Sequence, residues 1–205
     1  DNDFSLAAAG LVSLSDWLQT AALNLDELHL PQCEISDEGL QALAATVNHC
    51  KDLDLSANFS ITAAGFRYLS ASLQSENCCL KNLYLGWMDT VNGGVEVLAR
   101  GLVGNKVLRR LHLHIECQED FEISPAGWSA LSKALCDTST INNTYLSNHI
   151  IQELWDDLDY DLVEYFDIDE RVVQYLQLNK EDPQYAARCK ILMSHTHLNM
   201  TPLLQ

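Results

Sequence analysis

Basic residues and long apolar runs are both scarce in this chain of 205 residues. Only 12 Lys and Arg stand against 29 Asp and Glu, which gives a formal net charge of −17. Binding to nucleic acid or to an anionic membrane surface needs clustered Lys and Arg, so neither partner is expected. No apolar stretch approaches the roughly 20 residues of a membrane-spanning helix, so membrane insertion is not expected either.

Motifs for catalysis, metal binding and disulfide frameworks are also missing. The seven cysteines contain no C-x-x-C pair, which favours reduced thiols in an intracellular, cytoplasmic protein and leaves a nucleus or organelle open. There is no phosphate loop, no Ser-His-Asp elbow and no H-E-x-x-H, so we expect neither enzyme activity nor a cofactor. His112 and His114 could ligate a metal from one strand, but a third ligand is lacking, and we expect no metal site.

The chain does contain an internal repeat, which is set by its glycines. Five of its nine glycines stand at positions 10, 39, 65, 94 and 127, and apolar residues follow each of these five one, four and eight positions later. That spacing places one apolar stripe along a helix. It predicts helices near residues 8–20, 37–48, 63–75, 92–104 and 125–137, and Ser36, Thr62 and Ser124 stand where N-caps are expected.

Short segments with alternating apolar residues lie between these helices. They cover residues 25–30, 50–55, 80–85, 108–113 and 141–146. Alternation with a period of two is typical of a half-buried strand. Strands are therefore predicted to centre on Leu28, Leu53, Leu83, Leu111 and Tyr145. A strand, a turn and a helix in regular succession predict a parallel sheet with helices on one face only.

The repeated pattern L-x-x-L-x-L-x-x-N/C, followed by a turn and a helix, resembles the ribonuclease-inhibitor type of leucine-rich repeat. Cys33 and Asn58 occupy the ninth position as that type expects, whereas Met88, Glu116 and His149 depart from it. The segment 187–202 resembles the C-terminal region of a large diatom-type family of ribonuclease-inhibitor-like repeat proteins. The resemblance implies an α/β leucine-rich-repeat solenoid, a curved horseshoe with a parallel β-sheet on the concave face and helices on the convex face.

Three regions follow along the chain. Residues 1–152 hold five leucine-rich repeats, of which the first is truncated; residues 153–171 form an acidic insert, and residues 172–205 form a C-terminal capping region. The insert interleaves acidic and aromatic residues, which fits a solvated loop and an arm for a basic partner equally well. In the cap, residues 175–179 favour a last short strand, and Asp182 with Pro183 predicts the start of a helix that ends near His195.

In this class of repeat the third, fifth and seventh positions of the strand motif point away from the helices. Tyr, Trp, Arg and His are the types of residue that anchor protein interfaces. The side chains expected to bind a partner on this face are Asp52, Asp54, Tyr84, Arg110, His112, His114 and Tyr145, with Trp87 at the rim. A solvated strand face without a ligand is the alternative.

These features favour a non-catalytic scaffold that binds another protein through the concave face, alone or as a subunit of a larger complex. The negative charge favours a partner with a basic patch. One alternative is a small-GTPase regulator, because Ran GTPase-activating proteins share this repeat class and an acidic tail. The other is an enzyme inhibitor that resembles ribonuclease inhibitor and acts on a basic target.

Overall fold

The computed structural model describes residues 8–20, 24–86, 88, 93–113, 123–154 and 170–196. Within these residues, four strands form one sheet in the order β1 (Leu25–His29), β2 (Cys50–Asp54), β3 (Asn82–Tyr84) and β4 (Arg110–His112). Every neighbouring pair is parallel. Strands that follow one another in the sequence therefore lie side by side, as the alternating segments predict.

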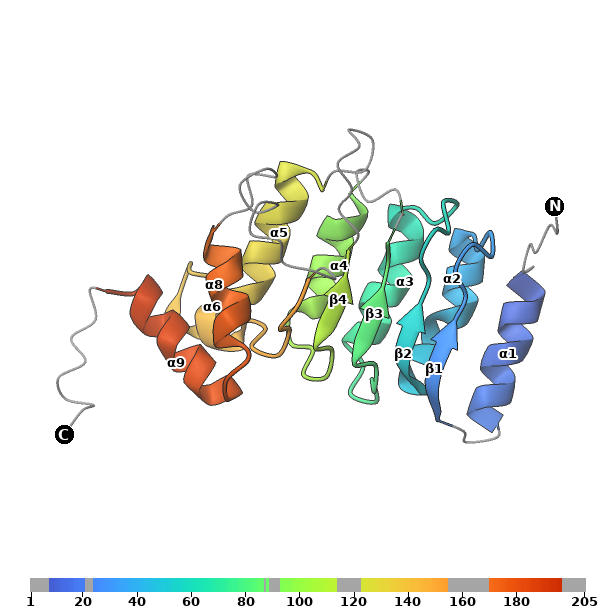
Figure 1. Ribbon diagram of the computed structural model, residues 1–205, viewed down its shortest axis with the longest axis horizontal. Coiled ribbons are helices and arrows are strands. Elements are labelled where there is room, and N and C mark those ends of the chain that lie inside the picture. Colours follow the sequence, from blue (N-terminus) through green and yellow to red (C-terminus); the bar gives the residue numbers. More distant parts are fainter. Residues whose placement is uncertain are drawn as a thin grey trace.

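Helices fill the connections between the strands and cover one side of the sheet (Figure 1). They are α1 (Ala8–Thr20), α2 (Asp37–Leu43), α3 (Ala63–Leu73), α4 (Gly94–Leu102) and α5 (Pro125–Leu135). The helix predicted over residues 37–48 is an α-helix that continues as the 3-10 helix η1 (Ala44–Asn48). The chain thus has an α/β fold with a parallel sheet.

Three of these helices begin at the predicted N-caps. The hydroxyl of Ser36 accepts a hydrogen bond from the backbone N–H of Gly39, and the hydroxyl of Ser124 does the same for Gly127. Thr62 caps α3 by accepting from the N–H of Ala64. Each cap satisfies a first-turn N–H that the helix itself leaves without an acceptor, which typically contributes about 1 kcal/mol.

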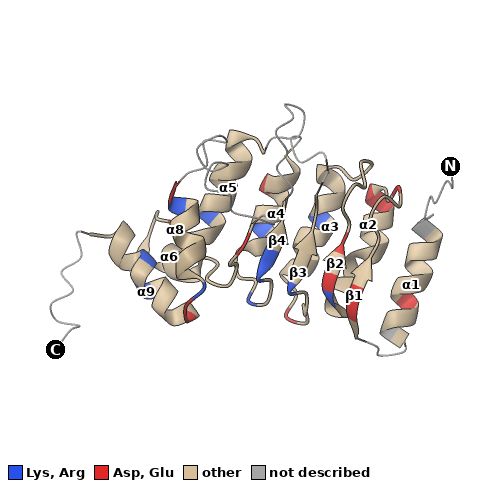
Figure 2. Ribbon diagram, in the orientation of Figure 1, with Lys and Arg blue, Asp and Glu red and all other residues tan. Residues whose placement is uncertain are grey.

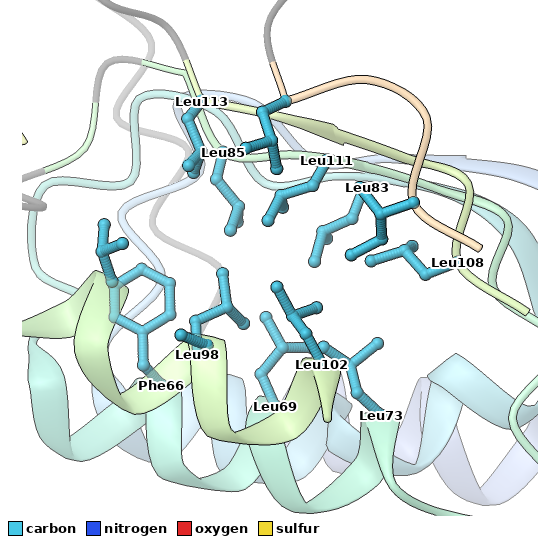
Figure 3. Close-up of a cluster of buried hydrophobic side chains, with 14 of the residues drawn as sticks. Phe66, Leu69, Leu73, Leu83, Leu85, Leu98, Leu102, Leu108, Leu111 and Leu113 are labelled. Atoms are coloured by element: carbon cyan, nitrogen blue, oxygen red, sulfur yellow. The ribbon is translucent and has the colours of Figure 1, made fainter. Parts of the chain in front are cut away.

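The core lies between the sheet and the helices. Leu53, Leu83 and Leu111 occupy the same register position on β2, β3 and β4, and all three are buried. Figure 3 shows leucines of the strands facing Phe66 on α3 and Leu98 on α4. Burial of each such side chain stabilises the fold by roughly 1.5–3 kcal/mol, so the leucine layers are the main source of stability.

Asn58 connects the turns that follow β1 and β2. Its Oδ1 accepts hydrogen bonds from the N–H groups of Cys33 and Ile35 at 3.1 and 3.0 Å, and its Nδ2 donates to the carbonyls of Leu30 and Leu55 at 2.9 and 2.8 Å. The side chain is fully buried. Asn58 therefore satisfies buried backbone groups of two successive repeats from the ninth position of its motif.

A second series of buried asparagines precedes the strands and was not identified from the sequence. Asn105 stands three residues before Leu108; its Oδ1 accepts from the N–H of Leu108 at 2.8 Å, and its Nδ2 donates to the carbonyl of Leu73 at 2.6 Å. Asn148 has the same arrangement one repeat later, with its Nδ2 donating to the carbonyl of Leu102 at 2.8 Å. These side chains join each repeat to the one before it.

The predicted strand around Tyr145 is wrong, because residues Ile141–Leu146 form the helix α6. Thr140 caps this helix by accepting from the N–H of Asn143. The place beside β4 is taken instead by Glu153, whose carbonyl accepts from the N–H of Leu111 at 2.9 Å. Residues 151–154 present buried Ile151 and Leu154, whereas the predicted segment had a threonine at its central apolar position.

The predicted strand at residues 175–179 is also wrong, because α8 (Glu170–Leu178) covers most of it. Val172, Tyr175 and Leu176 are its buried residues, and their spacing is that of a helix face. The helix predicted after Asp182 is confirmed as α9 (Pro183–Ser194), with Asp182 as its N-cap. The sequence pattern therefore predicted α9 correctly, whereas it predicted a strand in place of the C-terminal part of α8.

A buried lysine holds the cap against the last repeat. Lys190 on α9 is completely buried, and its Nζ donates to the carbonyls of Leu135 and Asn148 at 2.8 and 3.0 Å. A third hydrogen bond, of 2.8 Å, reaches Oδ1 of Asn179. Burial lowers the pKa of Lys190 to about 7. Three acceptors match the three N–H donors of an ammonium group, so this side chain links α5, the loop before residue 150 and α8 to α9.

Candidate interaction surface

The sheet face opposite the helices carries the candidate site, and we call it the open face. Because side chains alternate along a strand and Leu53, Leu83 and Leu111 point into the core, their neighbours in sequence point outward. The register then forms two rows across the sheet. The first row contains Glu27, Asp52, Asn82 and Arg110, and the second contains His29, Asp54, Tyr84 and His112.

Carboxylates dominate the β1–β2 half of the open face, as the red residues in Figure 2 show. Asp52 accepts a hydrogen bond of 2.8 Å from Nδ2 of Asn82. Asp54 accepts from the N–H of Ser56 at 2.9 Å and lies 3.6 Å from Nδ1 of His29. Within the described residues, neither aspartate forms an ion pair with Lys or Arg. The charge of Asp52 acts on the neighbouring Lys51, whose pKa it helps to raise.

Tyr84 and His112 form an aromatic pair in the second row. Their rings are stacked, with centroids 4.4 Å apart and an interplanar angle of 10°. His112 retains only 8% exposure, whereas Tyr84 is partly exposed. The partly exposed ring of Tyr84 thus lies on the strand beside that of Asp54, backed by the buried His112. Stacking restricts the freedom of both rings before any partner binds.

Arg110 is already engaged by a carboxylate of its own chain. Its Nε lies 2.9 Å from Oε2 of Glu153, and both side chains are partly exposed. Glu153 was not selected from the sequence as a site residue, because the sequence pattern placed the fifth strand ten residues too early. This ion pair lies at the β4 side of the open face and places one cation and one carboxylate there.

The structure brings together five of the eight residues that the sequence selected, namely Asp52, Asp54, Tyr84, Arg110 and His112. Tyr145 is a correction, since it lies on α6 with 62% of its surface exposed and contributes nothing to the open face. Trp87 and His114 lie outside the described residues. Glu27, His29 and Asn82 complete the rows. The repeat pattern places all three at outward-facing positions of the strands, although they were not among the residues selected to bind a partner.

A separate groove of about 610 Å³ lies between α4, α5 and α6, on the helix side of the molecule. Its walls combine small and apolar side chains with exposed charges, including Ala99, Arg100, Ala130, Lys133 and Leu146. Among the described residues, no group of three or more His, Cys, Asp or Glu could hold a metal ion. Nor is any helix in the described part of the chain long and apolar enough to cross a membrane.

The α/β fold with its four-stranded parallel sheet is compatible with repeats of the leucine-rich type. No family model matches the chain. The chain is similar to human NACHT, LRR and PYD domains-containing protein 5, with 31% identity over 113 residues. This match covers 54% of the chain but only 9% of that protein, so the matched segment spans less than a tenth of the length of this relative. The name of the relative includes leucine-rich repeats, and the match supports repeats of this kind here.

Proposed function

We propose that this chain is a non-catalytic scaffold that binds another protein through its open face, with repeats of the ribonuclease-inhibitor type. The hydrogen bonds of Asn58 at the ninth motif position support that type of repeat. In this proposal the partner presents a basic patch to Asp52 and Asp54 and an apolar side chain to the Tyr84–His112 pair.

The observation that carries the proposal is the position of these two aspartates. They are successive outward-facing residues of β2, and the partners that contact them within the described residues are an amide, a backbone N–H and an imidazole. Lys51 acts on Asp52 through its charge without forming an ion pair with it. A Lys or Arg side chain from a partner would form charge-assisted hydrogen bonds here. The surrounding negative charge would also speed association with such a partner, and added salt would slow it.

The test of the aspartates uses a labelled oligoarginine peptide as the probe and fluorescence anisotropy as the readout. The double variant Asp52→Asn plus Asp54→Asn keeps the shape of both side chains and removes two charges. Its matched control is Asp16→Asn plus Glu181→Gln, which removes two exposed charges elsewhere. We expect the open-face variant to bind about tenfold more weakly, which corresponds to about 1.4 kcal/mol, and the control to bind like the wild type. Equal affinities for the two variants would contradict the proposal.

Tyrosine substitutions test the apolar half of the open face once a natural partner has been purified. Tyr84→Ala removes the stacking partner of His112. Tyr145→Ala removes an exposed tyrosine from α6, away from the open face, and is the matched control. Binding should weaken in the first variant only, with both folds checked by circular dichroism. Loss of binding in the Tyr145 variant alone would place the interface on the helix side instead.

A further inference from the structure

Basic residues gather at the edge of the sheet where the strands begin. Lys51, Lys81 and Arg109 each follow the first residue of their strand motif, and we call them the basic row. The N–H of Lys81 donates to the carbonyl of Lys51 at 2.6 Å, and the N–H of Arg109 donates to the carbonyl of Lys81 at 2.8 Å. The three residues therefore lie on consecutive strands about 4.8 Å apart, and all three are exposed.

This concentration is unusual for so acidic a chain. Four of its 12 basic residues, namely Lys51, Lys81, Arg109 and Arg110, lie at or next to the beginnings of β2, β3 and β4. Figure 2 shows Lys and Arg in blue on and near β2, β3 and β4. Like charges on neighbouring strands repel one another, so the cations of the basic row do not stabilise the sheet through their contacts with each other.

A contact between β1 and β2 indicates which chemical group the basic row binds. Asp26 occupies the equivalent position on β1, and its Oδ1 lies 2.6 Å from Nζ of Lys51. The hydrogen bond and charge of Lys51, with a smaller effect from the charge of Lys81, lower the pKa of Asp26. Beside the row, Arg110 also holds a carboxylate, that of Glu153. Carboxylates on neighbouring chain segments thus meet the cations of this edge at hydrogen-bonding distance.

Lys81 and Arg109 differ from Lys51 because they form no ion pair within the described part of the chain. We propose that they bind a carboxylate-rich segment of a partner protein, with one carboxylate on each cation. The surface lies at the N-terminal edge of the strands, whereas the proposed function uses the open face. A phosphate polymer, whose charges are closely spaced, needs a larger basic surface than these two cations.

The two surfaces carry opposite charge, and together they would fix the orientation of a partner. A basic patch would face Asp52 and Asp54, and an acidic segment would reach the basic row. Reversal of that arrangement would place like charges against each other at both surfaces, which costs affinity. The inference about the basic row nevertheless stands on its own residues, and its test does not depend on the open face.

The experiment titrates the full chain into a labelled oligoglutamate peptide and follows fluorescence anisotropy. Lys81→Glu plus Arg109→Glu reverses the two free cations of the row. The control, Lys180→Glu plus Arg188→Glu, makes the same change of net charge at two exposed residues of the C-terminal cap. The wild type and the control should bind the peptide with similar affinity, and the row variant should lose at least about tenfold, or about 1.4 kcal/mol.

Three results would overturn the inference. They are absence of oligoglutamate binding by the wild type at low salt, equal loss in both variants, and tighter binding of a single-stranded oligodeoxynucleotide of the same charge, which would indicate a nucleic-acid site. The open-face variant Asp52→Asn plus Asp54→Asn should retain oligoglutamate binding. Failure of oligoarginine binding therefore bears on the open face alone, and failure of oligoglutamate binding bears on the basic row alone.

Discussion

Replacement of Asn148 with alanine should destabilise the chain far more than loss of an average polar side chain. Asn148 is 1% exposed, and its Oδ1 accepts from the N–H groups of Ile150 and Ile151 at 2.8 and 2.9 Å. Its Nδ2 donates to the carbonyls of Leu102 and Asn105 at 2.8 and 3.2 Å. Alanine would leave two buried N–H groups without acceptors and would remove a donor from two carbonyls.

Each of these four lost hydrogen bonds should cost about 1 kcal/mol, which gives a loss on the order of 4 kcal/mol in the free energy of unfolding. That is a large share of the roughly 5–15 kcal/mol that stabilises a typical domain. The loss should also loosen the contact between the last two repeats, because Asn148 bridges them. Even partial relaxation of the loop should leave a loss of more than about 2 kcal/mol, since unpaired buried groups are costly.

The measurement is urea denaturation followed by far-ultraviolet circular dichroism. A lower midpoint with an unchanged slope would show that the stability, and not the unfolded state, has changed. The control is Asn142→Ala, which alters an exposed asparagine on α6 and should shift stability by less than about 0.5 kcal/mol. If the Asn148 variant matched this control, the argument from its four hydrogen bonds would be wrong.

Two further predictions concern the core and the pH dependence of stability. Leu83→Ala should cost about 2–5 kcal/mol, because Leu83 is fully buried between Leu53 and Leu111, and an unchanged melting temperature would contradict this. Burial, and then the charge of Lys190, lowers the pKa of His149 to about 4 from the ordinary 6.5. Because the unfolded chain binds this proton first, stability should fall as pH decreases from 6.5 towards 4, by at most about 3 kcal/mol at 1.36 kcal/mol per pKa unit. The His149→Gln variant should lack this contribution, and identical pH profiles would refute it.

The sequence determined the elements of the first four repeats because their signals are local. Period-two alternation placed β1 to β4, and the glycine-based helical spacing placed α1 to α5 within a few residues. The side-chain caps at Ser36, Thr62, Ser124 and Asp182 act over two or three residues, so they too could be found without the fold. Five of the selected site residues followed from the same alternation.

Only the tertiary structure determined which segment of the fifth repeat pairs with β4 and which elements form the C-terminal cap. Two segments near the end of the repeat offered apolar residues, and the one with Ile151 and Leu154 pairs with β4 because it also places Asn148 against the previous repeat. This choice moved Tyr145 off the open face and brought Glu153 to Arg110.

Long-range hydrogen bonds explain why the sequence pattern did not predict which segment pairs with β4. Lys190 donates to carbonyls 55 and 42 residues earlier in the chain, and Asn148 donates to one 46 residues earlier. No local pattern encodes these partners, since a buried polar group is stable only where packing supplies acceptors from other elements. Alternation and helix caps reflect the conformational preferences of a few adjacent residues, whereas the order of strands at the end of the sheet depends on which segment can satisfy all its buried groups at once.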